Sequence, residues 1–463
     1  MSNKANRLDD RRSMMLDTPI SRLIPKMAIP TVIAMLITSV YSMADSYFVH
    51  FLGTSATAAV GVNMSIDQTI MMAGSFLAVG SNSYISRLMG AKQNDKASAT
   101  LSAAFFTAFF LGILVMVPGL MFTEKMVRLL GATNSSAKYA VDYANYILIA
   151  APFMASSFVL NQCLRSEGSP VYSMVGMGLG GILNIALDPL FIFTFDMGVG
   201  GAALATAISK FISFCILIFP YIRKHSVLRL SIKRISFSRD IVRETTLMGM
   251  PSLLRTGLSV VSFIIINNFA GRYSDSALAG ISVVTRIMMV PTFAILGFAQ
   301  GFQPVAGYNF GATRYDRVKE SFRFSSLVAV ISVTVVSLLM AVFSKQLILL
   351  FTEGDMEMVK IGQFCLITQC VIMPLNAWVI IVNMLYAALG KPVGAIILGS
   401  TRQGICFLPV VFILPIFLGI YGLASAQAVA DLLAFVVAIP FAISIYRGVN
   451  RKLRDELPLP EIE

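Results

Sequence analysis

The segment Gly198-Val-Gly-Gly-Ala-Ala-Leu-Ala205 returns 221 residues later as Gly419-Ile-Tyr-Gly-Leu-Ala-Ser-Ala426, with two glycines and two alanines at matching positions. Further matches keep this offset to within one residue: MAIP at 27–30 with MGMP at 248–251, Gly80 with Gly301, Gly90-Ala91 with Gly311-Ala312, and Gly168-x-Pro170 with Gly390-x-Pro392. One match could arise by chance, but an ordered series over most of the chain indicates an internal repeat. The sequence therefore predicts two homologous halves.

The composition places most of the chain in lipid. Hydrophobic residues make up 56% of the 463 residues and charged residues 13%, whereas soluble proteins carry about 25% charged residues. A chain with so little polar surface cannot cover itself in water, which excludes a soluble enzyme, a disordered protein and a fibrous protein. Because one span takes about 20 apolar residues, twelve spans are predicted, at 23–49, 55–82, 98–122, 138–162, 171–195, 200–222, 244–270, 277–303, 322–344, 359–386, 393–417 and 420–446.

The repeat and the spans together predict the architecture. Six spans per half is an even number, so both halves enter the membrane with the same orientation. We expect an all-α integral membrane protein with twelve transmembrane helices in two parallel six-helix repeats, an N-lobe and a C-lobe, around a central cleft. Two equal bundles of this kind favour a transporter over a channel, a receptor or a membrane enzyme. The predicted parts are a cytoplasmic tail (1–22), the N-lobe (23–222), a cytoplasmic linker (223–243), the C-lobe (244–446) and a second cytoplasmic tail (447–463).

The positive charges lie mostly on one side of the predicted spans. With both termini in the cytoplasm, 26 of the 36 Lys and Arg residues fall in inside segments and 6 in outside loops. This is the positive-inside pattern of a multi-pass protein of the cell membrane. It accounts for the net charge of +12 without nucleic acid as a partner. The polar segment before the first span has no cleavage site behind a short apolar stretch, so we expect no cleavable signal peptide.

Cysteine and histidine offer no catalytic or metal-binding pattern. The chain has five cysteines, all in apolar runs, and two histidines, and it contains no CxxC or HExxH motif. These numbers indicate free buried thiols rather than a disulfide framework, a zinc site or a catalytic triad. We therefore expect no enzymatic activity, no cofactor and no catalytic residue.

Two aspartates of the predicted N-lobe stand out because of the polar residues near them. Asp45 lies toward the outer end of the first span, and Asp188 lies toward the outer end of the fifth, four residues after Asn184 and therefore on the same helix face. Thr206 reaches a similar depth in the sixth span. Ionisable groups inside a bilayer are costly and are functional candidates by default. Oxygen ligands with little positive charge nearby suit a proton or a sodium ion. The structural alternative is that Asp188 bonds local backbone at a kink before Pro189.

Other charged residues inside the spans have a simpler interpretation as ion pairs. The acidic ones are Asp45, Asp67, Asp188 and Asp431, and the basic ones are Lys210, Arg255, Arg286 and Arg402. Since the two signs balance, internal ion pairing is the simpler interpretation for Asp431, Arg286 and Arg402, and we expect Lys210 at mid-span to be paired as well. Three residues stay open as parts of a substrate cleft. Asp67 would serve a cationic substrate or a second proton, whereas Arg255 and Arg402 would favour an anionic or zwitterionic cargo.

At these residues the chain resembles the multidrug and toxic compound extrusion (MATE) family, in its bacterial MepA-like or DinF-like branch. The stretches that carry the resemblance are Asp45-Ser-Tyr-Phe-Val-His-Phe-Leu-Gly53, Tyr84-Ile-Ser-Arg-Leu-Met-Gly-Ala91, Leu187-Asp-Pro-Leu-Phe-Ile192 and Gly200-Gly-Ala-Ala-Leu-Ala-Thr-Ala-Ile-Ser209. Each Gly/Ala-rich piece is weak by itself, but the ordered set is specific. With the repeat and the twelve spans, the resemblance covers nearly the whole chain.

The resemblance implies cation-coupled export by alternating access. In the DinF-like branch the coupling ion binds a polar cluster of the N-lobe, which corresponds here to Asp45, Asn184, Asp188, Thr206, Asn161 and Tyr41. Pro30 corresponds to the point at which the first span bends. A sodium ion would bind at Asp45, Asn184, Asp188 and Thr206. The NorM-like branch instead uses carboxylates of the seventh and tenth spans, and the central parts of those spans here contain no Asp or Glu.

These observations predict a proton- or sodium-coupled multidrug efflux antiporter for bulky hydrophobic, mainly cationic compounds, working as a monomer in the lipid bilayer. Such compounds need an apolar, aromatic or Met-lined wall, which the 26 methionines and 33 phenylalanines could supply. The alternatives are a flippase for a lipid-linked precursor and an exporter of anionic metabolites, both kept open by the arginines inside the spans.

Overall fold

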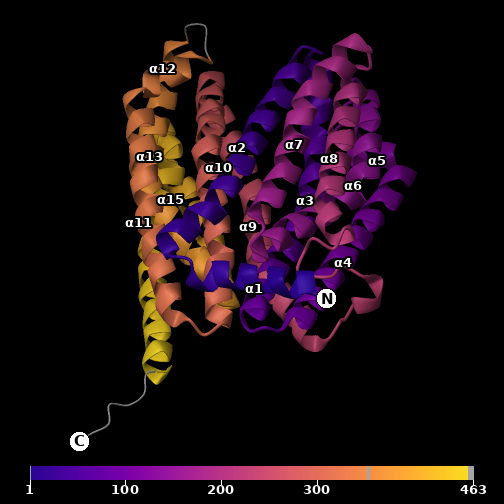
Figure 1. Ribbon diagram of the computed structural model, residues 1–463. Helices are drawn as coiled ribbons and strands as arrows, with labels where there is room; N and C mark the ends of the chain where they lie inside the picture. Colours follow the sequence, from indigo (N-terminus) through magenta and orange to yellow (C-terminus); the bar gives the residue numbers. More distant parts are fainter. Residues whose placement is uncertain (1, 352–354, 457–463) are drawn as a thin grey trace, which may run out of the picture. The chain divides into compact units, whose positions relative to one another are not determined.

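The computed structural model describes residues 2–351 and 355–456, and in that part of the chain every regular element is a helix (Figure 1). The elements are α1 (Ser2–Asp17), α2 (Ile20–His50), α3 (Thr54–Gly90), α4 (Asn94–Met121), α5 (Thr123–Leu129), α6 (Ala137–Ser166), α7 (Pro170–Pro189), the π-helical turn η1 (Leu190–Thr194), α8 (Gly198–Ile222), the 3₁₀ turn η2 (Ile232–Arg234), α9 (Arg239–Tyr273), α10 (Asp275–Gly311), α11 (Tyr315–Val342), α12 (Ser344–Leu349), α13 (Met356–Ala388), α14 (Pro392–Ser400), the π-helical turn η3 (Thr401–Ile405) and α15 (Phe407–Glu456).

The helices account for the predicted membrane spans. Ten stretches of the described chain are long and apolar enough to cross a bilayer. The last of them, Pro392–Asp455, holds two spans, because Gly419 breaks the helix inside α15 with a φ of 57° and a ψ of −134°. α3 is not among the ten, but its 37 residues cover the predicted span 55–82. The prediction of an all-α integral membrane protein is thus confirmed.

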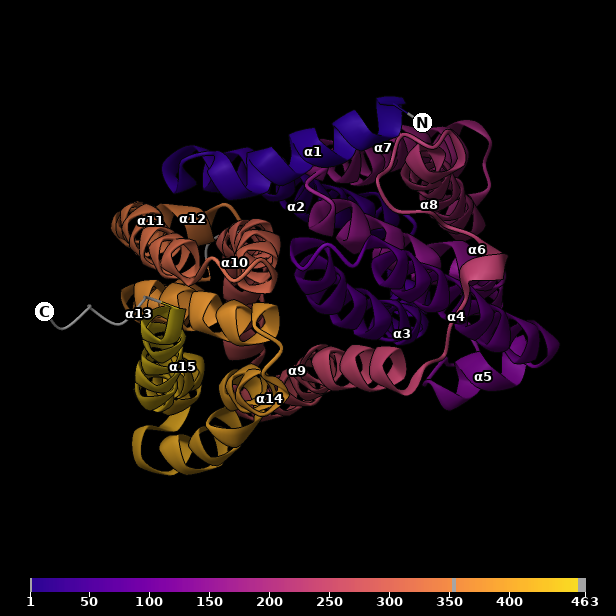
Figure 2. The same cartoon turned by 60° about the horizontal axis from the view of Figure 1, so that its bottom comes forward.

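The chain forms two compact units. The first unit consists of Met1–Met14 and Ile29–Gly249, and the second of Met15–Ala28 and Met250–Glu463. Within the first unit α6 packs against α3, α4 and α8, and within the second α13 packs against α10, α11 and α15 (Figures 1 and 2). Each unit therefore has one central helix surrounded by the others.

Two of the three boundaries between the units fall at the repeated Met-x-x-Pro motif, and the third lies between Met14 and Met15 in α1. The chain changes unit between Ala28 and Ile29 in α2, and again between Gly249 and Met250 in α9. The same offset of 221 residues that relates the two motifs also relates these two boundaries. The first turns of α2 consequently pack with the second unit, and those of α9 pack with the first.

The repeated glycines Gly80 and Gly301 let these first turns approach their neighbours. A Cβ atom on Gly80 in α3 would lie 2.0 Å from the carbonyl oxygen of Thr245 in α9. One on Gly301 in α10 would lie 2.4 Å from the Cα atom of Ala28 in α2. No side chain fits at such distances, so glycine recurs here because two helix backbones touch.

The repeated Gly-x-Pro motif starts equivalent helices in the two units. Gly168 and Gly390 have φ angles of 75° and 70°, a left-handed conformation that glycine adopts without a steric penalty. Two residues later Pro170 begins α7 and Pro392 begins α14, and proline suits the first helical turn because its missing N–H would have no partner there. The motif thus ends one helix and begins the next.

Glu167, in the turn between α6 and α7, organises the segment that follows α8. Its carboxylate accepts hydrogen bonds from the Tyr221 hydroxyl (2.8 Å), the Ser226 hydroxyl and the amides of Val227 (3.0 Å) and Leu228 (3.4 Å), and the Arg11 guanidinium lies 4.0 Å away. Glu167 is 1% exposed. Buried donors left without an acceptor are costly, so this carboxylate holds residues 226–228 in place.

We expect Glu167→Ala to lower the free energy of unfolding by about 2–3 kcal/mol, since several buried donors would lose their acceptor. Thermal unfolding of the detergent-solubilised protein measures this loss. Glu124→Ala is the matched control, because the Glu124 side chain is 67% exposed and its pair with Arg128 contributes about 0.5 kcal/mol or less. Equal unfolding temperatures for the two variants would contradict this role of Glu167.

Candidate functional site

A buried polar triad joins α7 to α8 in the first unit. The Asn184 amide nitrogen donates hydrogen bonds to the Asp188 carboxylate and to the Thr206 hydroxyl, both at 3.2 Å. Asp188 is fully buried and Asn184 is 2% exposed. The helical spacing of Asn184 and Asp188 places both on the face of α7 that meets α8, as the sequence predicted. The π-helical turn η1 begins directly after Pro189, and such turns often occur next to functional sites.

Tyr41 and Lys210 form a second contact next to this triad. The Lys210 ammonium group donates a hydrogen bond of 2.8 Å to the Tyr41 hydroxyl and lies 4.8 Å from the centroid of its ring. Lys210 is one helical turn after Thr206 in α8. Tyr41 in α2 comes close to α7 because Gly181 has no side chain, since a Cβ atom there would lie 3.1 Å from the Tyr41 ring. Lys210 therefore has a hydrogen-bond partner, but this partner is a neutral hydroxyl rather than the carboxylate of an ion pair.

Two further carboxylates from other helices lie within electrostatic range of Lys210. They are Asp45 in α2 and Asp67 in α3, and each interacts with Lys210 and with the other. Asp45 also interacts with Asp188. The three carboxylates thus belong to one electrostatic cluster, which we call the acidic cluster: Asp45, Asp67 and Asp188 with Lys210. Sequence reasoning had left Asp67 open between a cationic substrate and a second proton, and the structure brings it to the same cluster as Asp45.

Tyr143 is a member of this site that sequence reasoning missed. It is 3% exposed, and its phenol interacts electrostatically with Asp45, Asp67 and Asp188. The available signal was its depth, because Tyr143 lies five residues into the fourth predicted span from the outer side, close to the depth of Thr206. A tyrosine in an apolar run attracts less attention than a charged residue, although its hydroxyl can bond a carboxylate.

Buried oxygen atoms without a partner distinguish the acidic cluster from a set of ion pairs. One carboxylate oxygen of each aspartate (Asp45 Oδ1, Asp67 Oδ1 and Asp188 Oδ2) and the Asn184 carbonyl oxygen are buried and accept no hydrogen bond. Lys210 acts on Asp45 and Asp67, whereas Asp188 interacts with Asp45. Because the cluster contains three carboxylates and one lysine, it has an excess of negative charge. Such a group is stable inside a membrane protein when protons or a cation neutralise it.

The donor set fits a monovalent cation or protons better than a divalent metal. Across residues 2–351 and 355–456, no three His, Cys, Asp or Glu side chains are close enough together to hold a metal ion. A sodium site needs only one carboxylate together with neutral oxygens, and Asp188, Asn184 and Thr206 supply this combination. Each carboxylate can also take up a proton by itself.

Asn161 lies apart from the acidic cluster, which corrects the prediction that it is a member. Its amide nitrogen donates to the Ser173 hydroxyl (2.8 Å) and backbone carbonyl (3.3 Å), and its oxygen accepts from Arg165. Ser173 and Asp188 are fifteen residues apart in α7, which corresponds to about 22 Å along the helix. Asn161 therefore bonds at the opposite end of α7 from the cluster.

Pro30 lies inside a continuous helix. α2 runs from Ile20 to His50 without interruption, and the chain passes from the second unit to the first at Ala28–Ile29, two residues before Pro30. Proline removes one backbone hydrogen bond of the helix. The weak point of α2 therefore coincides with the point at which the helix passes between the units.

The charged residues of the second unit form a separate arrangement. Arg402, in η3, donates to Asp431 at 2.9 Å, and Gln427 donates to the same carboxylate at 2.9 Å. Arg402 and Asp431, each expected to form an ion pair, thus pair with one another. Arg255 interacts with Arg402 electrostatically as a like charge. Because Asp431 neutralises the charge of Arg402, Arg255 is the arginine of this pair that would attract an anion.

The spans, the internal repeat and the buried carboxylates define a multi-pass membrane transporter. The MatE family model matches residues 30–190 and 251–413, two stretches that begin at the two repeated prolines. The chain therefore belongs to the MatE family.

Among its relatives is the multidrug export protein MepA of Staphylococcus saprophyticus, 28% identical over 446 residues, which cover 94% of this chain and 94% of that protein. The protein of the same name from Staphylococcus aureus (strain bovine RF122 / ET3-1) is 29% identical over 425 residues, or 91% of this chain and 93% of the relative. The similarity thus extends over nearly the full length of both chains.

Solved structures share the fold. One is a MATE in complex with MaL6, with a TM-score of 0.90, 24% identity and coverage of 95% of this chain and 99% of the other. Another is an outward-facing multidrug resistance MATE family transporter of the MOP superfamily, with a TM-score of 0.89, 24% identity and coverage of 94% and 98%. The helix arrangement is accordingly that of known MATE transporters.

Proposed function

We propose that this protein is a cation-coupled multidrug exporter in which the acidic cluster binds the coupling ion. The observation that carries the proposal is the set of buried oxygen atoms on Asp45, Asp67 and Asp188 that accept no hydrogen bond. One lysine cannot neutralise three carboxylates, so protons or a sodium ion would complete the charge balance. The relatives named for multidrug export support drug-like compounds as the cargo.

The Asn184 amide supplies a simple way to admit a cation. Its nitrogen points at Asp188 and Thr206, and its own oxygen accepts no hydrogen bond. Rotation of the amide by half a turn exchanges nitrogen for oxygen and directs three oxygen atoms toward one point. When a proton is the coupling ion, the Asn184 amide nitrogen would donate a hydrogen bond to Asp188. When sodium is the coupling ion, the Asn184 amide oxygen would coordinate the sodium ion.

Ion binding acts on transport only if it favours one conformation over another. With Asp45 and Asp188 ionised, the first unit holds the outward-facing, cation-receptive state. Neutralisation of the cluster lets α2 bend near Pro30, which changes its contacts with α7 and α8 and releases the bound compound outward. Tyr41 is the residue of α2 that connects such a bend to Lys210.

The alternative cargo is an anion or a lipid-linked precursor, and Arg255 is the residue that favours it. Because Asp431 neutralises Arg402, Arg402 would contribute little to the attraction of an anion. Three carboxylates against one lysine in the first unit favour cations more strongly. We therefore assign hydrophobic cations as the main cargo and Arg255 as a minor determinant.

The test is ethidium efflux from proteoliposomes under an imposed proton gradient and then under an imposed sodium gradient. We expect one of the two gradients to drive efflux, and we expect Asp45→Asn, which mimics a permanently protonated carboxyl group, to abolish that drive. Asp142→Asn, a change of an aspartate in α6 outside the acidic cluster, serves as the control.

Two results would contradict the proposal. Normal efflux by Asp45→Asn, with an unchanged dependence on the ion gradient, would exclude Asp45 from coupling. The second is a lack of ethidium export by folded wild-type protein under both gradients. That second result would favour anionic or lipid-linked cargo, and Arg255 would be the next residue to replace.

A further inference from the structure

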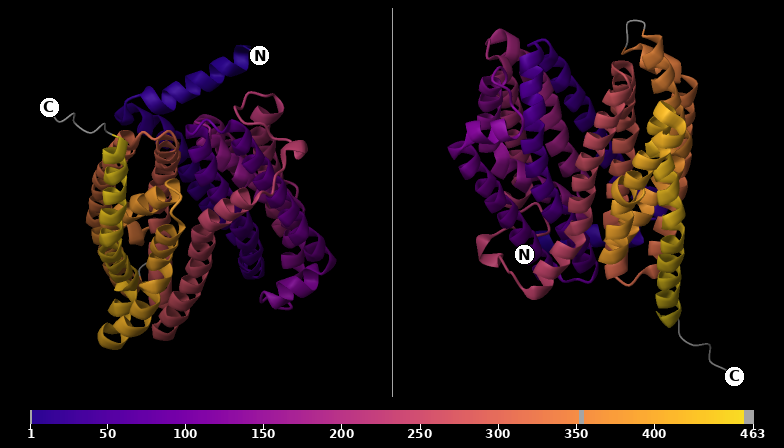
Figure 3. Two further views of the ribbon diagram at one scale, coloured as in Figure 1. Left: turned by 90° about the horizontal axis from the view of Figure 1, so that it is seen from below. Right: turned by 180° about the vertical axis from the view of Figure 1, so that it is seen from behind.

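A groove on the second unit runs between α11, α13 and α15, three helices that lie side by side in every view (Figures 1, 2 and 3). Its volume is about 630 Å³, and its apolar lining includes Phe322, Leu375, Trp378, Phe435, Ile439 and Ile443. A second hollow of about 460 Å³ continues it over the surface of α11 and shares Phe322, Val330, Trp378 and Tyr446 with it. All these residues lie in membrane-spanning helices.

One end of the groove is basic. Arg447 of α15 lines the main part and Arg323 of α11 lines its continuation, and both are exposed. Lys319, one turn before Arg323, lies 4.9 Å from the centroid of the Tyr446 ring. The acidic neighbour Glu320 interacts with Arg317, and the three basic side chains Lys319, Arg323 and Arg447 outnumber it at this end.

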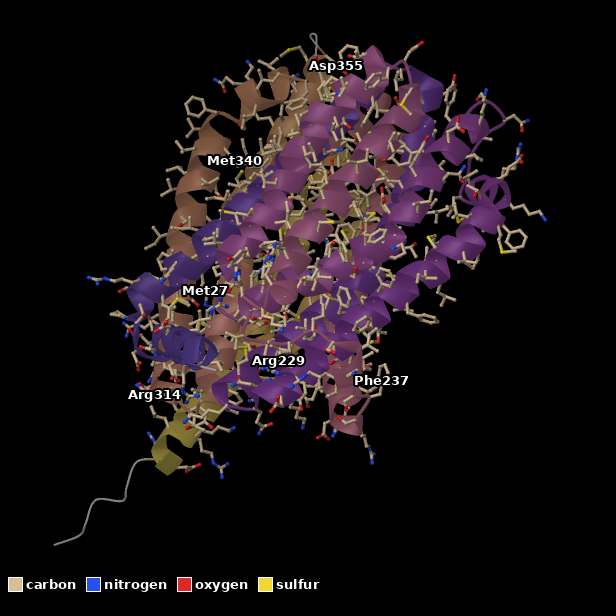
Figure 4. The ribbon with its side chains drawn as sticks, turned by 45° about the vertical axis from the view of Figure 1, so that its right-hand side comes forward. Met27, Arg229, Phe237, Arg314, Met340 and Asp355 are labelled. Atoms are coloured by element: carbon tan, nitrogen blue, oxygen red, sulfur yellow. The ribbon has the colours of Figure 1, made fainter. Side chains whose placement is uncertain are left out.

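The basic end points toward a membrane surface. α11 begins near Arg314, and Figure 4 shows Arg314 and Asp355 at opposite ends of the second unit. The last turns of α15 extend past the neighbouring helices on the Arg314 side (Figure 3). Phe435 and Arg447 are twelve residues apart in α15, which corresponds to about 18 Å. This length matches one leaflet of a hydrocarbon core about 30 Å thick.

We propose that this groove binds one anionic phospholipid from the leaflet on the Arg314 side, which the loop charges predict to be the cytoplasmic one. The acyl chains lie along Trp378, Phe435 and Ile439, and the phosphate group lies between Arg323 and Arg447. The charge complementarity decides the occupant, because an apolar groove alone would accept any lipid chain, whereas two arginines at headgroup depth select a negative headgroup. The proposal does not depend on the transport function.

Trp378 allows a direct test, because it is the only tryptophan of the chain. The full-length protein is reconstituted in phosphatidylcholine bilayers with a small fraction of brominated phosphatidylglycerol or, in parallel, of brominated phosphatidylcholine. Bromine on the acyl chain quenches tryptophan fluorescence at contact. We expect an apparent affinity about tenfold higher for the anionic lipid, and a loss of this preference at high salt.

The variant Arg323→Gln/Arg447→Gln is expected to quench equally with both brominated lipids. The control Arg229→Gln/Arg239→Gln removes two exposed arginines of the first unit and should keep the preference. Equal quenching by both lipids in the wild-type protein would overturn the proposal and leave only non-selective lipid contact. Absence of quenching by either lipid would also overturn it, because another protein or a second copy would then cover Trp378.

Discussion

Asp188→Asn is expected to reduce ion-driven efflux at least tenfold, which corresponds to about 1.4 kcal/mol of lost coupling free energy, while the protein stays folded. Asparagine has nearly the same shape, and its carbonyl oxygen can still accept the hydrogen bond that Asn184 donates to Asp188. The substitution removes the negative charge and the capacity to bind a proton. Coupling should therefore fail although packing between α7 and α8 is preserved.

The initial rate of ethidium efflux under the driving gradient measures this effect. Asp196→Asn is the matched control, because Asp196 is an exposed residue of the same unit. Its φ of 53° is also a conformation that asparagine adopts readily. A second readout separates coupling from damage, since exchange of ethidium across liposomes without any ion gradient should persist in Asp188→Asn. Undiminished gradient-driven efflux in this variant would remove Asp188 from the mechanism.

The sequence predicted those parts of the site that depend on position along one helix. Asn184 and Asp188 share a face of α7 because four residues make about one helical turn. The depth of Thr206 was also readable from its distance to the end of its span. The structure confirms that these three side chains meet, because a single hydrogen-bonding amide connects them.

The contacts of the site that depend on how one helix is rotated relative to the next could not be predicted from the sequence. In a helix that is apolar on all sides, the pattern of residues does not show which face points inward. Asp67 was consequently left open between a cationic substrate and a second proton, and Tyr143 was overlooked. Asn161 was included in the ion site, although it bonds to Ser173 at the far end of α7.

The fold, like the site, has features that the sequence predicted and features that it did not. The repeat and the number of spans are properties of the sequence, and the paired Gly-x-Pro motifs mark equivalent helix starts in both halves. The assignment of the first turns of α2 to the second unit could not be predicted, because nothing in the composition of residues 15–28 indicates that they pack with that unit. Only the repeated Gly80 and Gly301 hint at a close backbone contact, and they do not identify the partner.

Lys210→Met is expected to slow ion-driven efflux about tenfold and, at the same time, to raise the apparent affinity for the coupling ion. Lys210 is the positive charge that acts on both Asp45 and Asp67. Without it, two buried carboxylates repel each other and retain a proton or a sodium ion more tightly, because like charges at short range in a low-dielectric site are costly. Ion release would then limit the transport cycle.

The distinguishing observation is the ion concentration that gives half-maximal efflux, because a merely misfolded variant loses rate without a shift of this value. Lys210→Arg keeps the charge and should stay near the wild-type value, and Tyr41→Phe should show a smaller shift, since it removes only the hydroxyl that accepts the Lys210 hydrogen bond. Lys224→Met, at an exposed position after α8, controls for the loss of a lysine. An unchanged half-maximal concentration in Lys210→Met would show that Lys210 supports the helices without taking part in ion binding. A lower half-maximal concentration in Lys210→Met would show that the positive charge of Lys210 competes with the coupling ion for the carboxylates of the acidic cluster.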